Sequence, residues 1–120
     1  MYADYPYYTE SFAGTLLSAE DFPSLSARAE RYLDYVTRHR ITEATGAVKN
    51  AVCAAAEALY EVDRRYEAVP NGIKAENTDG YSVTYTEATA AKLRREQEEA
   101  MLEAIVWELA DTGLLYQGVG

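Results

Sequence analysis

The stretch from residue 51 to residue 60 constrains the fold of this chain more than any other. Nearly every position in it is apolar, and many are alanine. A helix without a polar face is surrounded by protein, and alanine side chains let neighbouring backbones come close. The apolar stripe continues on both sides at helical spacing, through Val48, Val52, Ala55, Leu59, Val62 and Tyr66. The sequence therefore predicts a central core helix over about residues 46–66.

A first amphipathic helix is predicted before it, from residue 22 to about Arg38. Ser18 followed by Asp21 resembles a capping box, and Pro23 suits a first helical turn. The apolar positions recur at helical spacing: Phe22, Leu25, Ala29, Tyr32, Leu33 and Val36. The cationic run of residues 38–40 then complements the dipole at the C-terminal end of this helix.

A third helix is predicted from Thr86 or Thr89 to just before Gly113, which stops it. Residues 92–99 are almost wholly polar, so this half is expected to project into solvent or to line a wet surface. Residues 100–110 are expected to be packed. Their large apolar side chains are Met101, Leu102, Ile105, Val106, Trp107 and Leu109.

Between the second and third helices, residues 71–85 are the only segment with a period of two. Tyr81, Val83 and Tyr85 alternate with hydroxyl residues, which predicts a strand. Residues 73–76 form a weaker second strand, residues 77–80 have turn chemistry, and Pro70 is expected to end the helix before them. A lone two-stranded ribbon is barely stable in water, so we expect it to lean on a neighbouring subunit. The expected interface residues are Ile73, Lys74, Tyr81, Val83 and Tyr85.

Both ends of the chain are read as extended arms. Residues 1–17 are rich in tyrosine and show no helical period; they either cover the domain's own core or reach a neighbour. Residues 114–120 form an apolar tail flanked by glycines, which either docks on another protein or folds back. The expected fold is a mainly α single domain over residues 1–120: a three-helix bundle with a β-hairpin-like excursion between helices 2 and 3 and extended N- and C-terminal arms.

The charge distribution argues against several classes of partner. The formal net charge is −9, and residues 67–120 carry ten acids against four bases. No broad basic face is available for phosphates, so ordinary nucleic-acid binding is disfavoured. The start of the chain has no signal-peptide character and no apolar run is long enough to span a membrane. A single cysteine cannot form an internal disulfide, which implies a reducing compartment or indifference to redox state.

No catalytic chemistry is expected. The one histidine, His39, lies between two arginines, and there is no zinc-type Cys/His cluster, phosphate-binding glycine loop or nucleophile elbow. Cys53 is expected to be a small core residue. The acids at positions 96, 98, 99 and 103 are read as a solvated helix face. We therefore expect no enzyme, no metal and no cofactor.

Six segments in order along the chain resemble head–tail connector proteins of tailed bacteriophages. Together they cover essentially the whole sequence: residues 2–12, 22–34, 48–54, 72–76, 79–85 and 113–119. In this sequence residues 76–78 replace the serine-containing run usual in the family.

The resemblance implies a structural adaptor (head-completion protein) of the virion neck, present in the host cytoplasm before assembly. Copies would form a ring, most often a dodecamer, beneath the portal protein and present a surface to the next neck or tail component. Double-stranded DNA would pass through the ring without specific binding, and no membrane is involved. We expect the tail to dock on the portal through Leu114, Leu115, Tyr116 and Val119, and the channel to be lined by Glu96, Glu99 and Glu103.

A second class of function is compatible with the same composition. A small acidic helical regulator, for example a nucleic-acid mimic, would bind a basic partner in a salt-sensitive way. Assembly state separates the two possibilities, because a mimic stays monomeric or dimeric whereas a connector forms rings on a portal.

Overall fold

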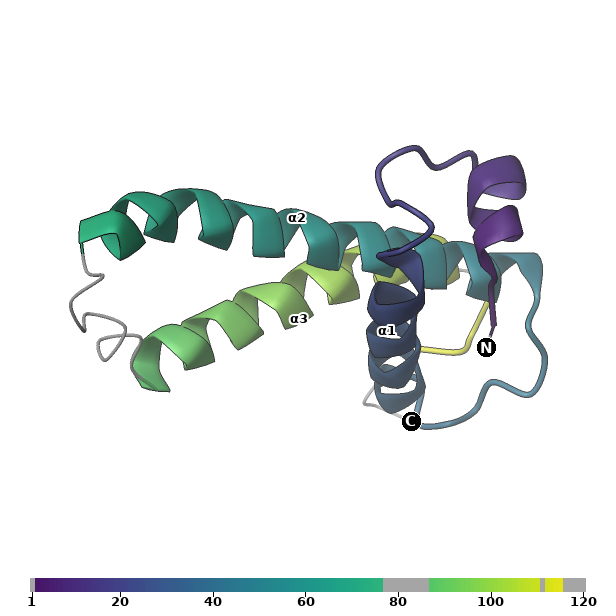
Figure 1. The fold of residues 1–120 in the computed structure, drawn as a ribbon. Coiled ribbons are helices and arrows are strands. Elements are labelled where there is room, and N and C mark those ends of the chain that lie inside the picture. Colours follow the sequence, from purple (N-terminus) through teal and green to yellow (C-terminus); the bar gives the residue numbers. More distant parts are fainter. Residues whose placement is uncertain (1, 77–86, 111, 116–120) are drawn as a thin grey trace.

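The computed structural model describes residues 2–76, 87–110 and 112–115, and these are built from helices (Figure 1). A short π-helical turn, η1 (Tyr7–Ser11), precedes three α-helices: α1 (Phe22–Val36), α2 (Gly46–Glu76) and α3 (Glu87–Leu109). Within the described ranges there is no strand. The mainly helical fold expected from the sequence is confirmed.

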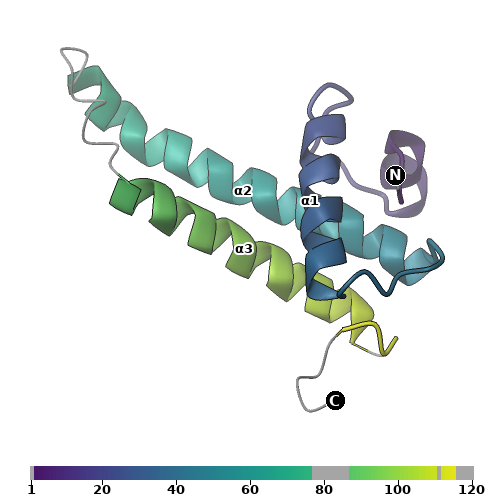
Figure 2. The same ribbon diagram turned by 90° about the horizontal axis from the view of Figure 1, so that it is seen from below.

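The frame of the molecule is an antiparallel pair formed by α2 and α3. The two helices run side by side, α1 crosses them near the C-terminal end of α3, and η1 lies beside the first turns of α2 (Figures 1 and 2). The result is a flat body whose extents are 50 × 37 × 19 Å. The alanine-rich part of α2 lies at the centre, where Ala51, Val52, Cys53, Ala55 and Ala56 are all fully buried. The predicted central helix is therefore confirmed.

The start of α1 follows the local sequence signals. The Asp21 N–H donates to Ser18 Oγ at 3.1 Å, and Pro23 occupies the first turn, where a missing N–H leaves no intrahelical acceptor unpaired. The face of α1 that carries Phe22, Ala29 and Leu33 is buried against the rest of the core. This helix ends at Val36, two residues before the end expected from the sequence.

The end of α1 is a Schellman motif built without glycine. The His39 N–H donates to Asp34 O at 2.9 Å and the Arg38 N–H donates to Tyr35 O at 3.2 Å, which are the two bonds of that motif. Arg38 and His39 have φ values of 57° and 58°, in the left-handed region that glycine adopts without steric strain. The sequence offered no glycine from which to predict this turn.

We expect Arg38→Gly to stabilise the fold relative to Arg38→Ala. Both variants lose the guanidinium, but only glycine relieves the left-handed strain, which is worth about 1 kcal/mol. Denaturant unfolding of the two variants measures the difference directly. Equal unfolding free energies would show that position 38 is not strained.

The prediction of a β-hairpin-like excursion is wrong for residues 73–76, the part of it that the structure describes. Residues 73–76, expected as the weaker strand, are the last turn of α2, and the helix runs through Pro70 rather than stopping before it. In a helix, the backbone N–H and C=O groups of these residues form hydrogen bonds within the same segment. An isolated two-stranded ribbon would leave the N–H and C=O groups along its edges unpaired. A proline inside a helix removes one N–H donor and crowds the carbonyl of the fourth residue before it, which costs about 3 kcal/mol, yet α2 continues through Pro70. The expected strand containing Tyr81, Val83 and Tyr85 lies outside the described residues.

The N-terminal segment is not an extended arm. Residues 5–11 are helical, and the segment folds onto the molecule's own core, the first of the two alternatives that the sequence left open. Its anchor is Tyr8, which is fully buried and whose ring lies among those of Tyr5, Phe12 and Phe22. Residues 1–17 show no helical period in the sequence because this segment packs through individual aromatic rings and not through one face of a helix.

The hydroxyl of Tyr8 joins three parts of the chain. It accepts hydrogen bonds from the N–H groups of Leu16 and Leu17, at 2.9 and 2.8 Å, and donates to Glu57 Oε2 at 2.7 Å. Gly14 lies directly over the ring, so that a Cβ there would be 2.2 Å from Tyr8 Cε1. The N-terminal segment is therefore held to α2 by one buried tyrosine with all of its hydrogen-bonding capacity in use.

Two tyrosines near the N-terminus have raised pKa values. Burial, and then the hydrogen bond to Asp34, raises the pKa of Tyr2 to about 12; burial, and then the bond to Glu57, raises the pKa of Tyr8 to about 12. Because these pKa values exceed the ordinary value of 10.0, folding favours the neutral phenols. Their contribution is fully present below pH 10 and is lost as the pH rises toward about 12.

We therefore expect the free energy of unfolding to fall with rising pH across that interval. Denaturant titrations at a series of alkaline pH values measure the slope. Tyr2→Phe lacks one of the phenols whose pKa is raised, so its slope should be shallower than that of the wild type. An identical slope in the variant would assign the alkaline instability to other groups.

After α3 the chain turns back toward the core. The Thr112 N–H and hydroxyl both donate to Leu109 O, at 3.0 and 2.8 Å, and Gly113 follows with a φ of 78°. Gly113 takes the left-handed conformation expected of a helix stop, although α3 ends earlier, at Leu109. Leu114 and Leu115 are half-buried against the core, and Arg40 Nη2 donates to Leu114 O at 2.6 Å. The described part of the tail is therefore folded back and not extended.

Candidate functional site

Among the described residues no group of three or more His, Cys, Asp and Glu side chains could hold a metal ion. Cys53 is fully buried, and burial raises the pKa of its thiol to about 12, so it is a core residue with little nucleophilic character. His39 lies on the exposed turn after α1. In the part of the chain that the structure describes, no helix is long and apolar enough to cross a membrane.

The acids expected to line a channel lie on α3. Glu96, Glu99 and Glu103 are spaced by three and four residues, which places them on one side of the helix. Glu99 and Glu103 are exposed and Glu96 is half-buried. Arg94 and Arg95 lie just before them and are also exposed, so the acidic stripe begins beyond these two bases.

A polar link that the sequence reading missed joins the three α-helices. Gln97 on α3 is 9% exposed, and its Nε2 donates to Asp63 Oδ1 on α2 at 2.5 Å. Arg28 on α1 lies 3.7 Å from the other carboxylate oxygen of Asp63. Gln97 lies in residues 92–99, which the sequence predicts to project into solvent or to line a wet surface. Its position one turn before Met101 on the buried side of α3 is the signal that could have identified it.

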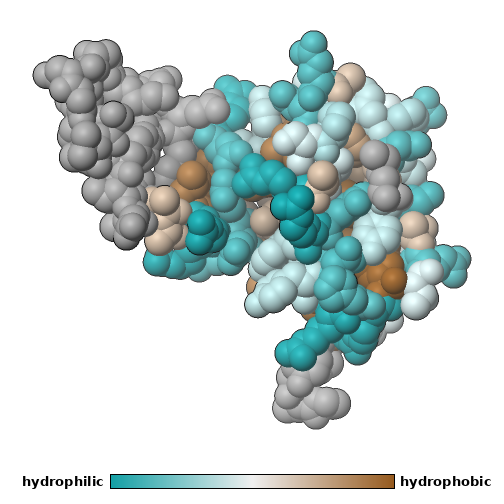
Figure 3. All heavy atoms as spheres, turned by 60° about the horizontal axis from the view of Figure 1, so that its bottom comes forward, coloured by the Kyte–Doolittle hydropathy of each residue, from teal (hydrophilic) through white to brown (hydrophobic). Residues whose placement is uncertain are grey.

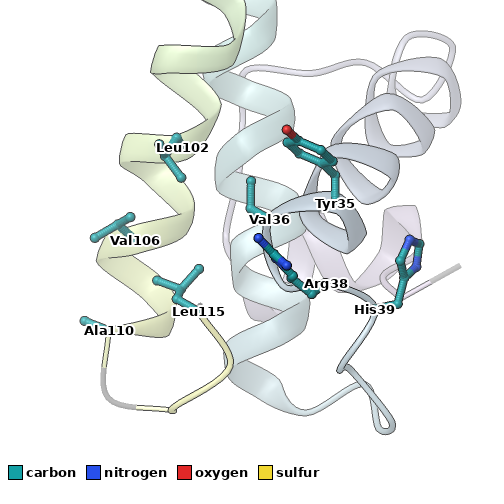
Figure 4. A pocket seen from close by; sticks show the side chains of 8 residues that line it. All are labelled: Tyr35, Val36, Arg38, His39, Leu102, Val106, Ala110 and Leu115. Carbon is teal, nitrogen blue, oxygen red and sulfur yellow. The ribbon is translucent and has the colours of Figure 1, made fainter. Parts of the chain in front are cut away.

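An open groove lies between the C-terminal end of α1 and the C-terminal half of α3, with a volume of about 930 Å³. We call it the groove; Figure 4 shows its lining, which is Tyr35, Val36, Arg38, His39, Leu102, Val106, Ala110 and Leu115. In this view the Arg38 side chain points toward α3, whereas the His39 ring points away from it. Leu115 forms part of the lining because the chain folds back after α3. The groove is therefore apolar with a cationic side chain at its edge.

The second half of α3 is packed on one side only. Met101, Ile105 and Leu109 are buried, as expected, but Leu102 is 39%, Val106 43% and Trp107 84% exposed. The sequence reading treated residues 100–110 as one packed block. A helical projection separates them, because positions four apart share a face and Trp107 lies on a different face from Ile105.

The outer face of α1 is basic, which the sequence reading also missed. Arg28, Arg31 and Tyr35 recur on α1 at spacings of three and four, and all three are exposed; Arg38, just beyond the end of the helix, is exposed as well. Tyr35, at 72% exposed, is the large hydrophobic side chain of this face. The acids of α1 are on another side, where Glu30 and Asp34 accept hydrogen bonds from Tyr2. Only a helical projection reveals this face, because bases and acids alternate along the sequence.

The remaining predicted interaction residues are divided between described and undescribed parts of the chain. Ile73 and Lys74 lie in the last turns of α2, far from the groove along the helix. Tyr81, Val83, Tyr85, Tyr116 and Val119 lie outside the described residues. The face shown in Figure 3 is mostly hydrophilic with separate apolar groups, so no single broad apolar surface stands out on that side.

The chain was compared with protein-family models, with curated proteins and with solved structures, and none of the three comparisons found a match.

Proposed function

We propose that this protein is a structural head–tail connector of a tailed bacteriophage, whose copies form a ring beneath the portal protein. The observation that carries the proposal is the ordered resemblance of six segments along the chain to that family. The helical architecture is compatible with this proposal. In such a role the protein would bind and align its neighbours and would catalyse no reaction. The virion neck is the proposed location, with the host cytoplasm as the place of synthesis.

The acidic face of α3 is the proposed wall of the DNA channel. Glu99 and Glu103 are exposed on the same side of the helix, and the chain as a whole carries a charge of −9. A wall of carboxylates repels phosphate, so duplex DNA moves past it without binding. The portal-facing contact is proposed for the C-terminal tail, beyond the two leucines that already contact the core.

The tail supplies the experiment that tests portal binding. Leu114 and Leu115 pack against the core, so deletion of residues 116–120 removes the distal tail and leaves that packing intact. We expect this truncation to keep its helical circular dichroism spectrum and to lose co-sedimentation with assembled portal. One tail alone binds weakly, because ordering it costs about as much as its burial contributes. Many tails on one ring act together, so the loss should be nearly complete.

The control is the full-length protein measured over a range of salt concentrations. A connector held by apolar tails keeps its portal binding as salt rises, whereas an acidic mimic loses its basic partner. Full portal binding by the truncated protein would place the anchor elsewhere on the chain. Failure of the full-length protein to bind portal would leave the acidic regulator as the better account.

A further inference from the structure

The α2–α3 pair extends beyond the point where α1 crosses it, and η1 lies on the opposite side of α1 (Figures 1 and 2). Two contacts define the side of α1 that faces this extension. Arg28 lies 3.7 Å from Asp63 on α2, and Gln97 on α3 donates to the same carboxylate. Burial, and then the charge of Glu98 on α3, raises the pKa of Tyr32 on α1. Glu98 therefore lies near α1 on this side of the crossing.

Exposed arginines from two helices share this side. Arg94 and Arg95 precede Glu98 by four and three residues, so both lie one turn farther out along the same side of α3. Arg31 follows Arg28 by three residues on α1. Arg31, Arg94 and Arg95 are all exposed. We call these three arginines, together with the neighbouring Tyr35, the arginine surface.

The arginine surface has the composition of a binding surface for an acidic protein. Arg28 already pairs with Asp63, whereas Arg31, Arg94 and Arg95 form no hydrogen bond or ion pair with any residue that the structure describes. Tyr35 is 72% exposed, and its ring lies 6.0 Å from that of Tyr32. Arginine and tyrosine are among the residues that most often carry the binding energy of protein interfaces.

The acids that complement this surface lie before α1. The first 22 residues carry four acids and no base. One of the four, Asp4, accepts a hydrogen bond from the backbone of η1. The other three, Glu10, Glu20 and Asp21, are exposed, and we call them the acidic segment. None of them belongs to the stripe on α3 that is proposed to line the channel.

One copy cannot bring its own acidic segment to its own arginine surface. Arg31 follows Asp21 by ten residues of α1, which is about 15 Å along the helix. The N-terminal segment also lies against the other side of α1, where Glu30 and Asp34 accept hydrogen bonds from Tyr2. Each copy therefore presents arginines on one side of α1 and the acidic segment on the other.

We propose that the acidic segment of one copy docks on the arginine surface of the next copy, head to tail. Glu20 and Asp21 lie against Arg31 and Arg94 of the neighbour, and Tyr35 packs beside them. Such a contact joins two different surfaces, and its repetition closes into a ring where the rotation between copies allows. The proposal deepens the connector assignment and rests on it, since it names the contact between neighbouring copies.

Duplex DNA is the other acidic partner that arginines and tyrosines could meet. The second copy is favoured because Glu98 lies beside the arginine surface and the chain carries a net charge of −9, so an extended run of phosphates is repelled around it. A neighbouring copy brings only a few carboxylates on a folded segment. Opposite charges that meet across such an interface set its register and suppress wrong pairings.

Cysteine cross-linking between two kinds of copy tests the contact. Ala91→Cys places a thiol on α3 one turn before Arg94 and Arg95, and Ala19→Cys places one beside Glu20; both alanines are exposed. A short bis-maleimide should link the two variants when they are mixed, both on assembled portal and alone at high protein concentration. It should not link either variant with itself. The native Cys53 is silent because it is buried.

Charge reversal tests the pairing of residues. Arg31→Glu in the Ala91→Cys copy sets like charges against Glu20 and Asp21, so the cross-link yield should fall about tenfold. Glu20→Arg in the Ala19→Cys copy should then restore the yield. Both positions are exposed, so circular dichroism and thermal melting of each variant should match the wild type.

Arg65→Glu is the matched control for net charge. Position 65 is exposed and lies two residues after Asp63, which is about 200° around α2 and so on a different face. The variant changes the charge of the chain as much as Arg31→Glu does. It should leave the cross-link yield unchanged, because it does not touch the arginine surface.

Three results would overturn this contact. They are cross-linking of the Ala91→Cys variant with itself, which indicates a symmetric contact; equal yields for Arg31→Glu and Arg65→Glu; and duplex DNA binding by the wild type that Arg31→Glu abolishes. A wild-type ring on the portal with any of these results would leave the connector proposal standing and this contact wrong. Charge-specific cross-linking of the free protein with portal left bare would support the contact and contradict the connector proposal.

Discussion

Gly14→Ala is expected to destabilise the protein by about 3 kcal/mol, at the upper end of the usual effect of overpacking. The new methyl group would lie 2.2 Å from Tyr8 Cε1 and 2.3 Å from Cζ, well inside contact distance. The ring cannot turn aside, because its hydroxyl holds Leu16, Leu17 and Glu57 and its faces lie against other aromatic rings. The N-terminal segment must therefore shift as a whole.

Denaturant unfolding and near-ultraviolet circular dichroism measure this effect. Gly46→Ala is the matched control, since a Cβ at position 46 meets nothing within 4 Å and alanine favours the helix that begins there. The control should be neutral or slightly stabilising. In a Tyr8→Leu background, Gly14→Ala should lose most of its effect, because the clashing ring is gone. An unchanged midpoint for Gly14→Ala alone would mean that the N-terminal segment is not held as described.

Tyr8→Phe is expected to destabilise the protein by about 2–4 kcal/mol. The variant keeps the ring and removes only the hydroxyl, which leaves the N–H groups of Leu16 and Leu17 and the Glu57 carboxylate without this partner. An unsatisfied buried polar group typically costs about 1–3 kcal/mol, and some of these groups can recover water. The effect should therefore exceed the loss of an ordinary tyrosine hydroxyl.

Tyr5→Phe is the comparison that isolates the network. The Tyr5 hydroxyl donates a single hydrogen bond, to Leu17 O at 3.2 Å, so its removal should cost about 1 kcal/mol or less. The free energy of unfolding of both variants is measured in the same denaturant assay. The difference between the two values is the contribution of the additional hydrogen bonds of Tyr8. Equal losses in the two variants would show that the three hydrogen bonds of the Tyr8 hydroxyl contribute no more than the single bond of Tyr5.

The elements that could be predicted from the sequence are those with a repeating pattern. The core helix around Val52 was recognisable because it is apolar all round, and the first helix because Phe22, Ala29 and Leu33 share one face. The prediction that α2 ends before Pro70 was wrong. It considered only the local effect of the proline and not the backbone hydrogen bonds that the helix keeps when it continues. The packing of the N-terminal segment through Tyr8 depends on contacts with residues far along the chain, which no local pattern contains.

The surfaces that could carry function were only partly visible in the sequence. The acidic stripe of Glu96, Glu99 and Glu103 was identified from composition and lies on α3 as expected. The groove was not, because it forms where α1 crosses α3 and where Leu115 folds back. Trp107 was assigned to the core because its neighbours are apolar, whereas the direction in which a side chain points depends on its angle around the helix.

The most direct test of the central claim is electron microscopy of the full-length protein mixed with assembled portal of the same phage. The connector account predicts a closed ring of additional density coaxial with the portal, coating one face of it and continuing the central channel. The same preparation without portal should show no rings of that size, because the contacts between free copies are weak. Portal particles that stay bare at saturating protein concentration would contradict the account.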